Sequence, residues 1–318
     1  MLFVKILVTG GAGFIGSNLV KALLEDKRVS LVRVLDNLST GFLHNIEEFF
    51  DNPKFEFIRG DIRDYDICLK ACEGIDLISH QAALGSVPRS IKNPLDTNSV
   101  NITGFLNVFA AAKESGIKRI VFAASSSTYG DSEELPKTED RTGKPLSPYA
   151  VTKVVNELYA EVFANLYGIE YVGLRYFNIF GSKQDPNGAY AAVIPIFFNK
   201  ALKNESPIFN GDGSNSRDFT YVDNAVQANI LGLFTERKDA TNQIYNIAFG
   251  ERMTLSELWE IIKKLTGCSV DAICGENRIG DIPHSIADIS KARKLLGYDP
   301  LFDVKKGLLI ALNWYKKI

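Results

Sequence analysis

The chain has 318 residues, of which 46% are apolar and 23% charged, ordinary values for a globular protein of about two domains. A net charge of −2 gives no electrostatic reason to expect a nucleic acid or an anionic membrane as partner. The N-terminus lacks the pattern of a signal peptide, and no apolar run reaches the roughly 20 residues of a membrane span. We therefore expect a cytoplasmic protein with four reduced cysteines and no metal site.

Short apolar runs alternate with helical stretches through the first half of the chain. This alternation predicts an α/β fold with a doubly wound parallel sheet of the Rossmann type. The expected strands cover residues 5–10, 31–36, 55–61, 76–81, 119–125 and 171–176.

The composition changes at about Gly181, where polar loops rich in Gly, Asn and Asp become frequent. Helices are expected over 254–267 and 289–297, and each ends in a glycine suited to a helix C-cap. We predict a dinucleotide-binding domain over 1–180 and a smaller, mixed α/β substrate domain over 181–318. Some strands and helices of the second domain are expected to return to the first.

A glycine-rich turn, TGGAGFIG, follows the first expected strand and opens a helix. Its glycines, Gly10, Gly13 and Gly16, allow the backbone to approach a pyrophosphate at the helix N-terminus. Asp36 ends the second strand, where a carboxylate can bind both adenosine ribose hydroxyls and would repel a 2′-phosphate. The sequence therefore predicts NAD rather than NADP. Asp61 suits either the adenine ring or a helix N-cap.

The stretch YAVTK carries Tyr149 and Lys153 one helical turn apart, downstream of a serine cluster. An ammonium beside a phenol favours the phenolate. Moving a phenol pKa from about 10 to about 7 requires roughly 4 kcal/mol of differential stabilisation. Behind a dinucleotide motif, this pair indicates redox chemistry on an alcohol.

Eight ordered motifs carry a resemblance that covers essentially the whole chain: TGGAGFIG, DNLSTG, GDIRD, HQAA, ASSSTYG, SPYAVTK, LRYFNIFG and RDFTYVDN. Together they resemble the extended short-chain dehydrogenase/reductase family, and within it the UDP-sugar 4-epimerase branch. The resemblance implies that Tyr149 is the base and that Lys153 lowers its pKa and binds the nicotinamide ribose. A serine four residues before Tyr129, namely Ser125, completes the catalytic triad. The implied NAD contacts are Gly10, Gly13, Phe14, Ile15, Asp36, Asn37, Ser39, Thr40, Gly41, Asp61, Ile62, Gln81, Ala82, Ala83, Tyr149 and Lys153.

The positions that follow Ser125 bear on the outcome of the reaction. Related dehydratases and decarboxylases carry acidic residues two or three positions before Tyr129, where this chain has Ser126 and Ser127. Without those carboxylates, elimination and decarboxylation lack a catalyst, and the transient ketone can only be reduced again. Ser126 and Ser127 are then expected to line the sugar pocket, although Ser127 also suits a strand end that binds loop amides.

The resemblance also assigns residues to the UDP group and the sugar. A serine, Ser285, stands seven residues after Arg278, where family members confined to UDP-glucose and UDP-galactose have a bulky tyrosine. A serine there leaves room for a 2-acetamido group, unless Ser285 is an ordinary loop residue; its neighbour His284 is expected to face solvent. The implied substrate contacts are Gly85, Ser86, Ser125, Ser126, Tyr149, Asn178, Ala192, Val193, Phe209, Asn210, Arg217, Arg278, Asp281 and Ser285.

The sequence thus predicts reversible C4 epimerisation of UDP-N-acetylglucosamine and UDP-N-acetylgalactosamine through a transient 4-keto sugar, with tightly bound NAD. The alternatives are a UDP-glucose/UDP-galactose 4-epimerase, an epimerase of the corresponding uronic-acid nucleotides, or a non-catalytic nucleotide sensor. The helix over 149–167 is apolar on more than one side. By the same resemblance it pairs with the helix over 101–115 in a homodimer.

Overall fold

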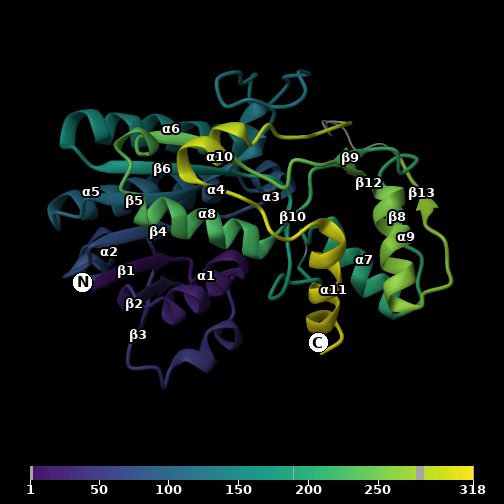
Figure 1. Cartoon of the computed structure of the whole chain (residues 1–318), viewed down its shortest axis with the longest axis horizontal. Coiled ribbons are helices and arrows are strands. Elements are labelled where there is room, and N and C mark those ends of the chain that lie inside the picture. Colours follow the sequence, from purple (N-terminus) through teal and green to yellow (C-terminus); the bar gives the residue numbers. More distant parts are fainter. Residues whose placement is uncertain (1–2, 189, 277–282, 318) are drawn as a thin grey trace.

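The computed structural model of the chain describes residues 3–188, 190–276 and 283–317. Its centre is a parallel sheet of seven strands in the order β11-β6-β5-β4-β1-β2-β3 (Figure 1). The six predicted strands are all confirmed, as is the doubly wound parallel architecture. The strands of this sheet are β1 (Val4–Thr9), β2 (Val29–Asp36), β3 (Phe55–Arg59), β4 (Leu77–His80), β5 (Arg119–Ser125), β6 (Glu170–Tyr176) and β11 (Gln243–Ile247).

The register of the strands brings their carboxyl ends to one edge of the sheet. Thr9 at the end of β1 lies opposite His80 at the end of β4. Ser125 at the end of β5 lies opposite Tyr176 at the end of β6. In an open parallel sheet, this edge is where ligands bind.

Helices cover both faces of the sheet, and each face has its own buried cluster. Because side chains alternate along a strand, Ile6 and Val8 of β1 join one cluster whereas Leu7 joins the other. One face carries α1 (Phe14–Glu25) and α8 (Val222–Phe234), which pack against each other. The opposite face carries α2 (Tyr65–Cys72), α5 (Phe105–Glu114) and α6 (Pro148–Tyr167), which α3 (Val87–Lys92), α4 (Pro94–Asn98) and the π-helical turn Ser99–Gly104 adjoin.

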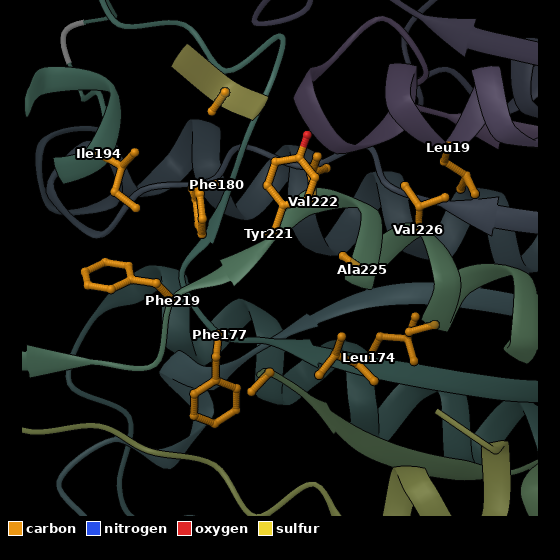
Figure 2. Close-up of a cluster of buried hydrophobic side chains, with 14 of the residues drawn as sticks. Leu19, Leu174, Phe177, Phe180, Ile194, Phe219, Tyr221, Val222, Ala225 and Val226 are labelled. Carbon is orange, nitrogen blue, oxygen red and sulfur yellow. The ribbon is translucent and has the colours of Figure 1, made fainter. Parts of the chain in front are cut away.

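A continuous hydrophobic cluster joins the sheet to the second half of the chain (Figure 2). Leu174 of β6 and Val226 of α8 lie at the sheet, and Phe177, Phe180 and Phe219 extend the cluster away from it. All five side chains are buried. The two halves of the chain therefore share a core.

From residue 179 onward, the described residues form short helices and three small sheets of two strands each. Gly267 and Gly297 end two of these helices in the left-handed conformation that the sequence predicted. None of the helices in the described ranges is long and apolar enough to cross a membrane. Besides α8, the α-helices of this part are α7 (Val193–Leu202), α9 (Leu255–Thr266), α10 (Ser290–Leu296) and α11 (Val304–Tyr315). The paired strands are β7 (Ile179–Phe180) with β10 (Thr220–Tyr221), β9 (Ser216–Arg217) with β12 (Met253–Thr254), and β8 (Ile208–Phe209) with β13 (Ile273–Cys274).

Candidate active site

A cleft of about 600 Å³ opens at the carboxyl edge of the sheet. The glycine turn after β1 and the loops after β2 and β3 form one end of it. The ends of β4, β5 and β6, the start of α3, the first two turns of α6 and the segment before α7 form most of the rest. Every residue that the sequence predicted as a cofactor contact lines this cleft.

At Gly10 and Gly16 the glycine turn leaves no room for a side chain. Gly10 has a left-handed φ of +71°, and a Cβ there would lie 2.6 Å from the backbone nitrogen of Ala82. A Cβ on Gly16 would lie 2.1 Å from the carbonyl oxygen of Gly10. Gly13 precedes α1 without a side-chain cap, so the first amides of the helix are available to a ligand. This cradle fits the pyrophosphate of a dinucleotide.

Asp36 connects the glycine turn to the loop that follows β2. Its carboxylate accepts hydrogen bonds from the amides of Ala12 at 2.9 Å and Leu38 at 2.8 Å. Burial raises the pKa of Asp36, and these two amides oppose the rise. The carboxylate is thus fixed at the end of β2, the position that the ribose prediction requires.

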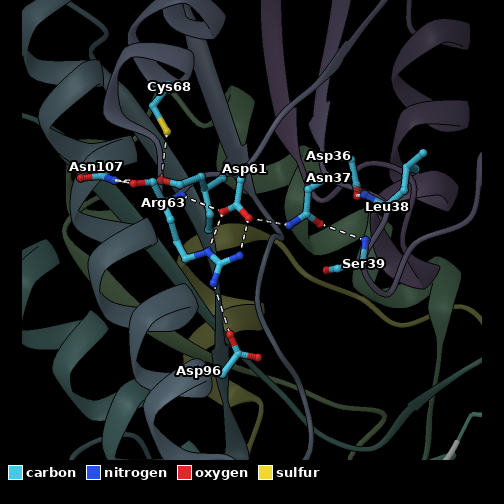
Figure 3. A network of polar contacts seen from close by, with 10 residues as sticks. Asp36, Asn37, Leu38, Ser39, Asp61, Arg63, Cys68, Asp96 and Asn107 are labelled. Carbon is cyan, nitrogen blue, oxygen red and sulfur yellow. Dashed lines mark hydrogen bonds and ion pairs between the residues drawn. The ribbon is translucent and has the colours of Figure 1, made fainter.

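A polar network links the loops after β2 and β3 (Figure 3). Asn37 donates from Nδ2 to Asp61 at 2.8 Å, and Arg63 pairs with the same carboxylate at 2.7 Å. Hydrogen bonding from Arg63 lowers the pKa of Asp61 to about 2, so Asp61 is ionised at neutral pH. The N-cap of α2 is Asp64, not Asp61, so the N-cap interpretation of Asp61 is wrong.

Helix α6 places Tyr149 and Lys153 on the cleft. Its N-cap is Ser147, whose side chain accepts from the amide of Ala150. Lys153 is only 4% exposed and donates from Nζ to the carbonyl oxygen of Ala123 on β5 at 2.7 Å. Its ammonium lies 5.8 Å from the centre of the Tyr149 ring. The two residues therefore lie at the end of β5, beside Ser125, the arrangement that the resemblance implies.

The electrostatics of this pair differ from the expectation drawn from spacing alone. Burial raises the pKa of Tyr149, and hydrogen bonding from Ser125 only partly opposes the rise. Burial also lowers the pKa of Lys153 to about 8, although Glu157 on the next turn opposes this. The physical reason is desolvation, which disfavours the charged form of both groups. In the protein alone, the phenol is therefore neutral at pH 7.

Ser125 has a single hydroxyl that serves several neighbours. Its Oγ accepts from Ser127 Oγ at 2.9 Å and from the Ser127 amide at 3.1 Å. Because both bonds use oxygen lone pairs, the Ser125 proton remains available to donate toward Tyr149. The group that accepts a loop amide at the strand end is therefore Ser125, whereas the Ser127 hydroxyl donates to Ser125, and Ser126 begins the same 3₁₀ turn.

His80 lies beneath the cleft and is buried. Its Nδ1 lies 2.8 Å from Thr9 Oγ1. Burial, with a smaller contribution from Lys153, lowers the pKa of His80 to about 3, so the imidazole is neutral. It is a core residue at the end of β4. His284, by contrast, is exposed, and its Nδ1 lies 2.9 Å from Ser216 Oγ.

The predicted substrate residues divide into three groups. Gly85, Ser86, Asn178 and Ala192 line the cleft together with the catalytic residues. Arg278 and Asp281 lie outside the described residues. The others, described but not lining the cleft, are Ser126, Val193, Phe209, Asn210, Arg217 and Ser285.

Most residues of the last group lie on or next to the short strands of the second half and do not line the cleft. Phe209 is buried on β8, and the carbonyl oxygen of Asn210 accepts from Asn215. Arg217 on β9 donates to the carbonyl oxygens of Ser216 and Pro283 at 3.0 Å. The half-buried Ser285 donates its amide to the carbonyl oxygen of Ser216 at 3.1 Å. The roles of these residues in uridine and sugar binding remain predictions.

Five further polar side chains line the cleft that the sequence interpretation did not assign to it: Arg89, Tyr176, Gln184, Asp185 and Tyr190. Gln184 has a buried Oε1 without a hydrogen-bond partner in the described structure. Buried polar atoms are usually bonded, so this oxygen suits a ligand donor. The signal in QDPNGAY was limited to its loop-forming composition, which does not distinguish Gln184 from its neighbours.

The chain is similar to known proteins over essentially its whole length. The model of the NAD dependent epimerase/dehydratase family matches residues 6–248. A relative from Methanocaldococcus jannaschii, provisionally named a UDP-glucose 4-epimerase, is 42% identical over 98% of this chain and 98% of its own.

Two solved structures resemble the whole chain. A UDP-N-acetylglucosamine 4-epimerase from Methanobrevibacter ruminantium, in complex with UDP-N-acetylmuramic acid, is 40% identical with a TM-score of 0.92. The alignment covers 100% of this chain and 99% of that one. A Thermus thermophilus UDP-glucose 4-epimerase in complex with NAD is 32% identical, with a TM-score of 0.88 over 98% and 99% of the two chains.

Proposed function

Because the chain belongs to the NAD dependent epimerase/dehydratase family, we propose that it inverts C4 of UDP-N-acetylglucosamine and UDP-N-acetylgalactosamine, reversibly and with bound NAD. Its cofactor is NAD. Its general activity, without regard to which hexose it prefers, is that of a UDP-sugar 4-epimerase. The observation that carries the proposal is the convergence of Ser125, Tyr149 and Lys153 on the cleft that the glycine turn begins.

The residues of the cleft divide the chemistry among them. Bound NAD would supply a reversible hydride acceptor for C4, and the positive charge of its nicotinamide ring would favour the phenolate of Tyr149. Tyr149, directly or through Ser125, takes the proton of the C4 hydroxyl and later gives it back. Lys153 stabilises the phenolate by its charge and contacts the nicotinamide ribose. Anchoring by UDP leaves the hexose free to present its other face between the two proton transfers.

The charges around the reacting carbon support epimerisation over elimination. Among the described residues that line the cleft, the carboxylates are Asp36, Asp61 and Asp185. None of these belongs to β5, to α6 or to the turn Ser126–Tyr129 between them. A ketone formed at C4 therefore meets no carboxylate base from these elements.

Small residues support the preference for an acetylated sugar. A Cβ built on Gly85, which lines the cleft, would meet no atom within 4 Å. Ser86 and Ser285, the other residues predicted to face the acetamido group, also have small side chains. The open space beside Gly85 suits a 2-acetamido group. A UDP-glucose/UDP-galactose 4-epimerase is the second candidate, favoured by the name of the Methanocaldococcus jannaschii relative.

The test is conversion of each purified UDP-hexose into its C4 isomer, separated by chromatography. We expect turnover of the acetylated pair and release of NAD on denaturation. Ser285→Tyr should remove turnover of the acetylated pair and retain that of UDP-glucose. A folded, NAD-bound protein that converts no UDP-hexose would exclude the proposal, and unchanged selectivity in Ser285→Tyr would exclude the role of Ser285.

We also propose a homodimer through α6. The helix exposes an apolar stripe along one side, away from the face that holds Lys153. Leu158 is 56% exposed and Leu166 is 68% exposed, and Val151 and Val162 continue the stripe. A contiguous apolar stripe on a helix favours burial against another chain.

A further inference from the structure

Arg89 is a cation in the cleft that the proposed reaction does not use. It lies on α3, three residues after Ser86, whose Oγ accepts from the Arg89 amide. Its guanidinium carbon lies 5.2 Å from the centre of the Tyr190 ring. Tyr190 belongs to the segment before α7 and also lines the cleft. The pair therefore connects two walls of the cleft that are distant in sequence.

The guanidinium of Arg89 has N–H donors that no acceptor among the described residues occupies. Arg63 and Arg175 pair with Asp61 and Glu157, and Lys153 donates to a carbonyl oxygen. The side chain of Arg89, by contrast, has no hydrogen-bond acceptor or carboxylate partner among residues 3–188, 190–276 and 283–317. A guanidinium carries five N–H donors in a planar fork. Contact with an aromatic ring leaves the edge of that fork free for a planar anion.

The place of Arg89 narrows the choice of anion. By the resemblance described above, the diphosphate is expected to be bound by Asn178, Arg217 and Arg278, of which Arg278 lies outside the described residues. Gly85 and Ser86, the predicted sugar contacts, lie immediately before α3, and α3 packs against the helix that carries Tyr149. Arg89 therefore lies beside the part of the cleft that is predicted to hold the sugar. A planar anion bound there would be a carboxylate carried by the hexose.

We propose that Arg89, aligned by Tyr190, binds a carboxylate carried by the hexose, so that the cleft accepts acidic derivatives of UDP-N-acetylhexosamine besides the neutral sugars. The inference rests on the proposed UDP-sugar site. Two positions can supply the carboxylate: C6, as in a uronic acid, or an ether substituent at C3. Both present the same planar group to the guanidinium.

The test is calorimetric binding to the NAD-loaded protein, which does not depend on turnover. The probes are UDP, UDP-N-acetylglucosamine, its C6 uronic acid and its C3 lactyl ether. In Arg89→Gln, the ratio of acidic to neutral affinity should fall about tenfold or more, because a hydrogen bond to a charged group is lost. Arg89→Lys and Tyr190→Leu should give smaller falls. Lys92→Gln, the same charge change on the exposed side of α3, should leave the ratio unchanged.

The arms of the experiment separate the possible results. A fall confined to the uronic acid assigns the carboxylate to C6, and one confined to the lactyl ether assigns it to C3. If Arg89→Gln weakens UDP by the same factor, Arg89 binds the diphosphate and the inference is wrong. A lower melting temperature with an unchanged ratio would show a structural role only. Failure of the wild type to epimerise, with the ratio still shifted, would overturn the proposed function and not this site.

Discussion

Replacing Lys153 by methionine should stabilise the fold while removing activity. Burial lowers the pKa of Lys153 from 10.5 to about 8, which corresponds to about 3 kcal/mol of unfavourable free energy at neutral pH. Methionine has a similar volume and carries no charge. The variant loses the bond to Ala123, which costs about 1–2 kcal/mol. The net expectation at pH 7.5 is a gain of about 1–2 kcal/mol in the free energy of unfolding.

The stability difference between wild type and Lys153→Met should change with pH in a direction that the depressed pKa of Lys153 determines. A lysine whose pKa is depressed in the folded state binds fewer protons there than in the unfolded chain, so the contribution of Lys153 to wild-type stability rises from about pH 8 toward 10.5. Lys153→Met lacks this rise. The difference between the two proteins should therefore change by about 2 kcal/mol between about pH 7.5 and pH 9.5, in favour of the wild type. Other titrating groups are common to both proteins and cancel in the difference.

The assay is urea unfolding of nucleotide-free protein at both pH values, followed by circular dichroism. Epimerase activity is measured on the same preparations and should fall about a hundredfold or more, since Lys153 assists the proton transfer. Lys92→Met, on the exposed surface of α3, is the matched control and should change neither quantity. A Lys153→Met protein that is less stable at pH 7.5, with a pH-independent difference from wild type, would refute the desolvation argument.

Single substitutions at the base, the cofactor cradle and the proposed dimer stripe test the remaining assignments. Tyr149→Phe should retain NAD, seen on denaturation, and lose about a thousandfold in turnover; more than a tenth of wild-type activity would contradict its role as base. Gly10→Ala should lose bound NAD and about 2 kcal/mol or more of stability in thermal unfolding, because of its left-handed φ and the approach of Ala82. Undiminished NAD content would contradict the cradle. Leu158→Glu should yield monomers in analytical ultracentrifugation, whereas the exposed Leu309→Glu on α11 should not; a wild type that sediments as a monomer ends the dimer proposal.

The sequence predicted six strands of the central sheet, since buried parallel strands are apolar runs closed by turn residues. It did not predict β11, because QIYNI (243–247) is short and contains two amides. The two-residue strands of the second half, such as Ile208–Phe209, form by tertiary pairing and leave no periodic signal.

The residues of the candidate site that could be predicted are those whose chemistry depends on their spacing along a single helix or turn. Tyr149 and Lys153 were found in this way. Arg89 and Tyr190 were not, because their contact joins segments about a hundred residues apart and depends on how α3 faces the segment before α7. The spacing of the motif also could not predict the pKa of Tyr149. That pKa is raised by burial, which depends on all the segments that pack around α6.

The return of β11 to the sheet has a consequence for how the chain is made. β11 pairs with β6, so it covers an edge that β6 would otherwise leave open. During synthesis this edge stays unpaired until residue 247 has left the ribosome, and open edges template aggregation. A fragment ending at residue 180 should therefore be insoluble. We therefore expect that the half of the chain with the catalytic residues does not form a soluble protein without the half that supplies β11.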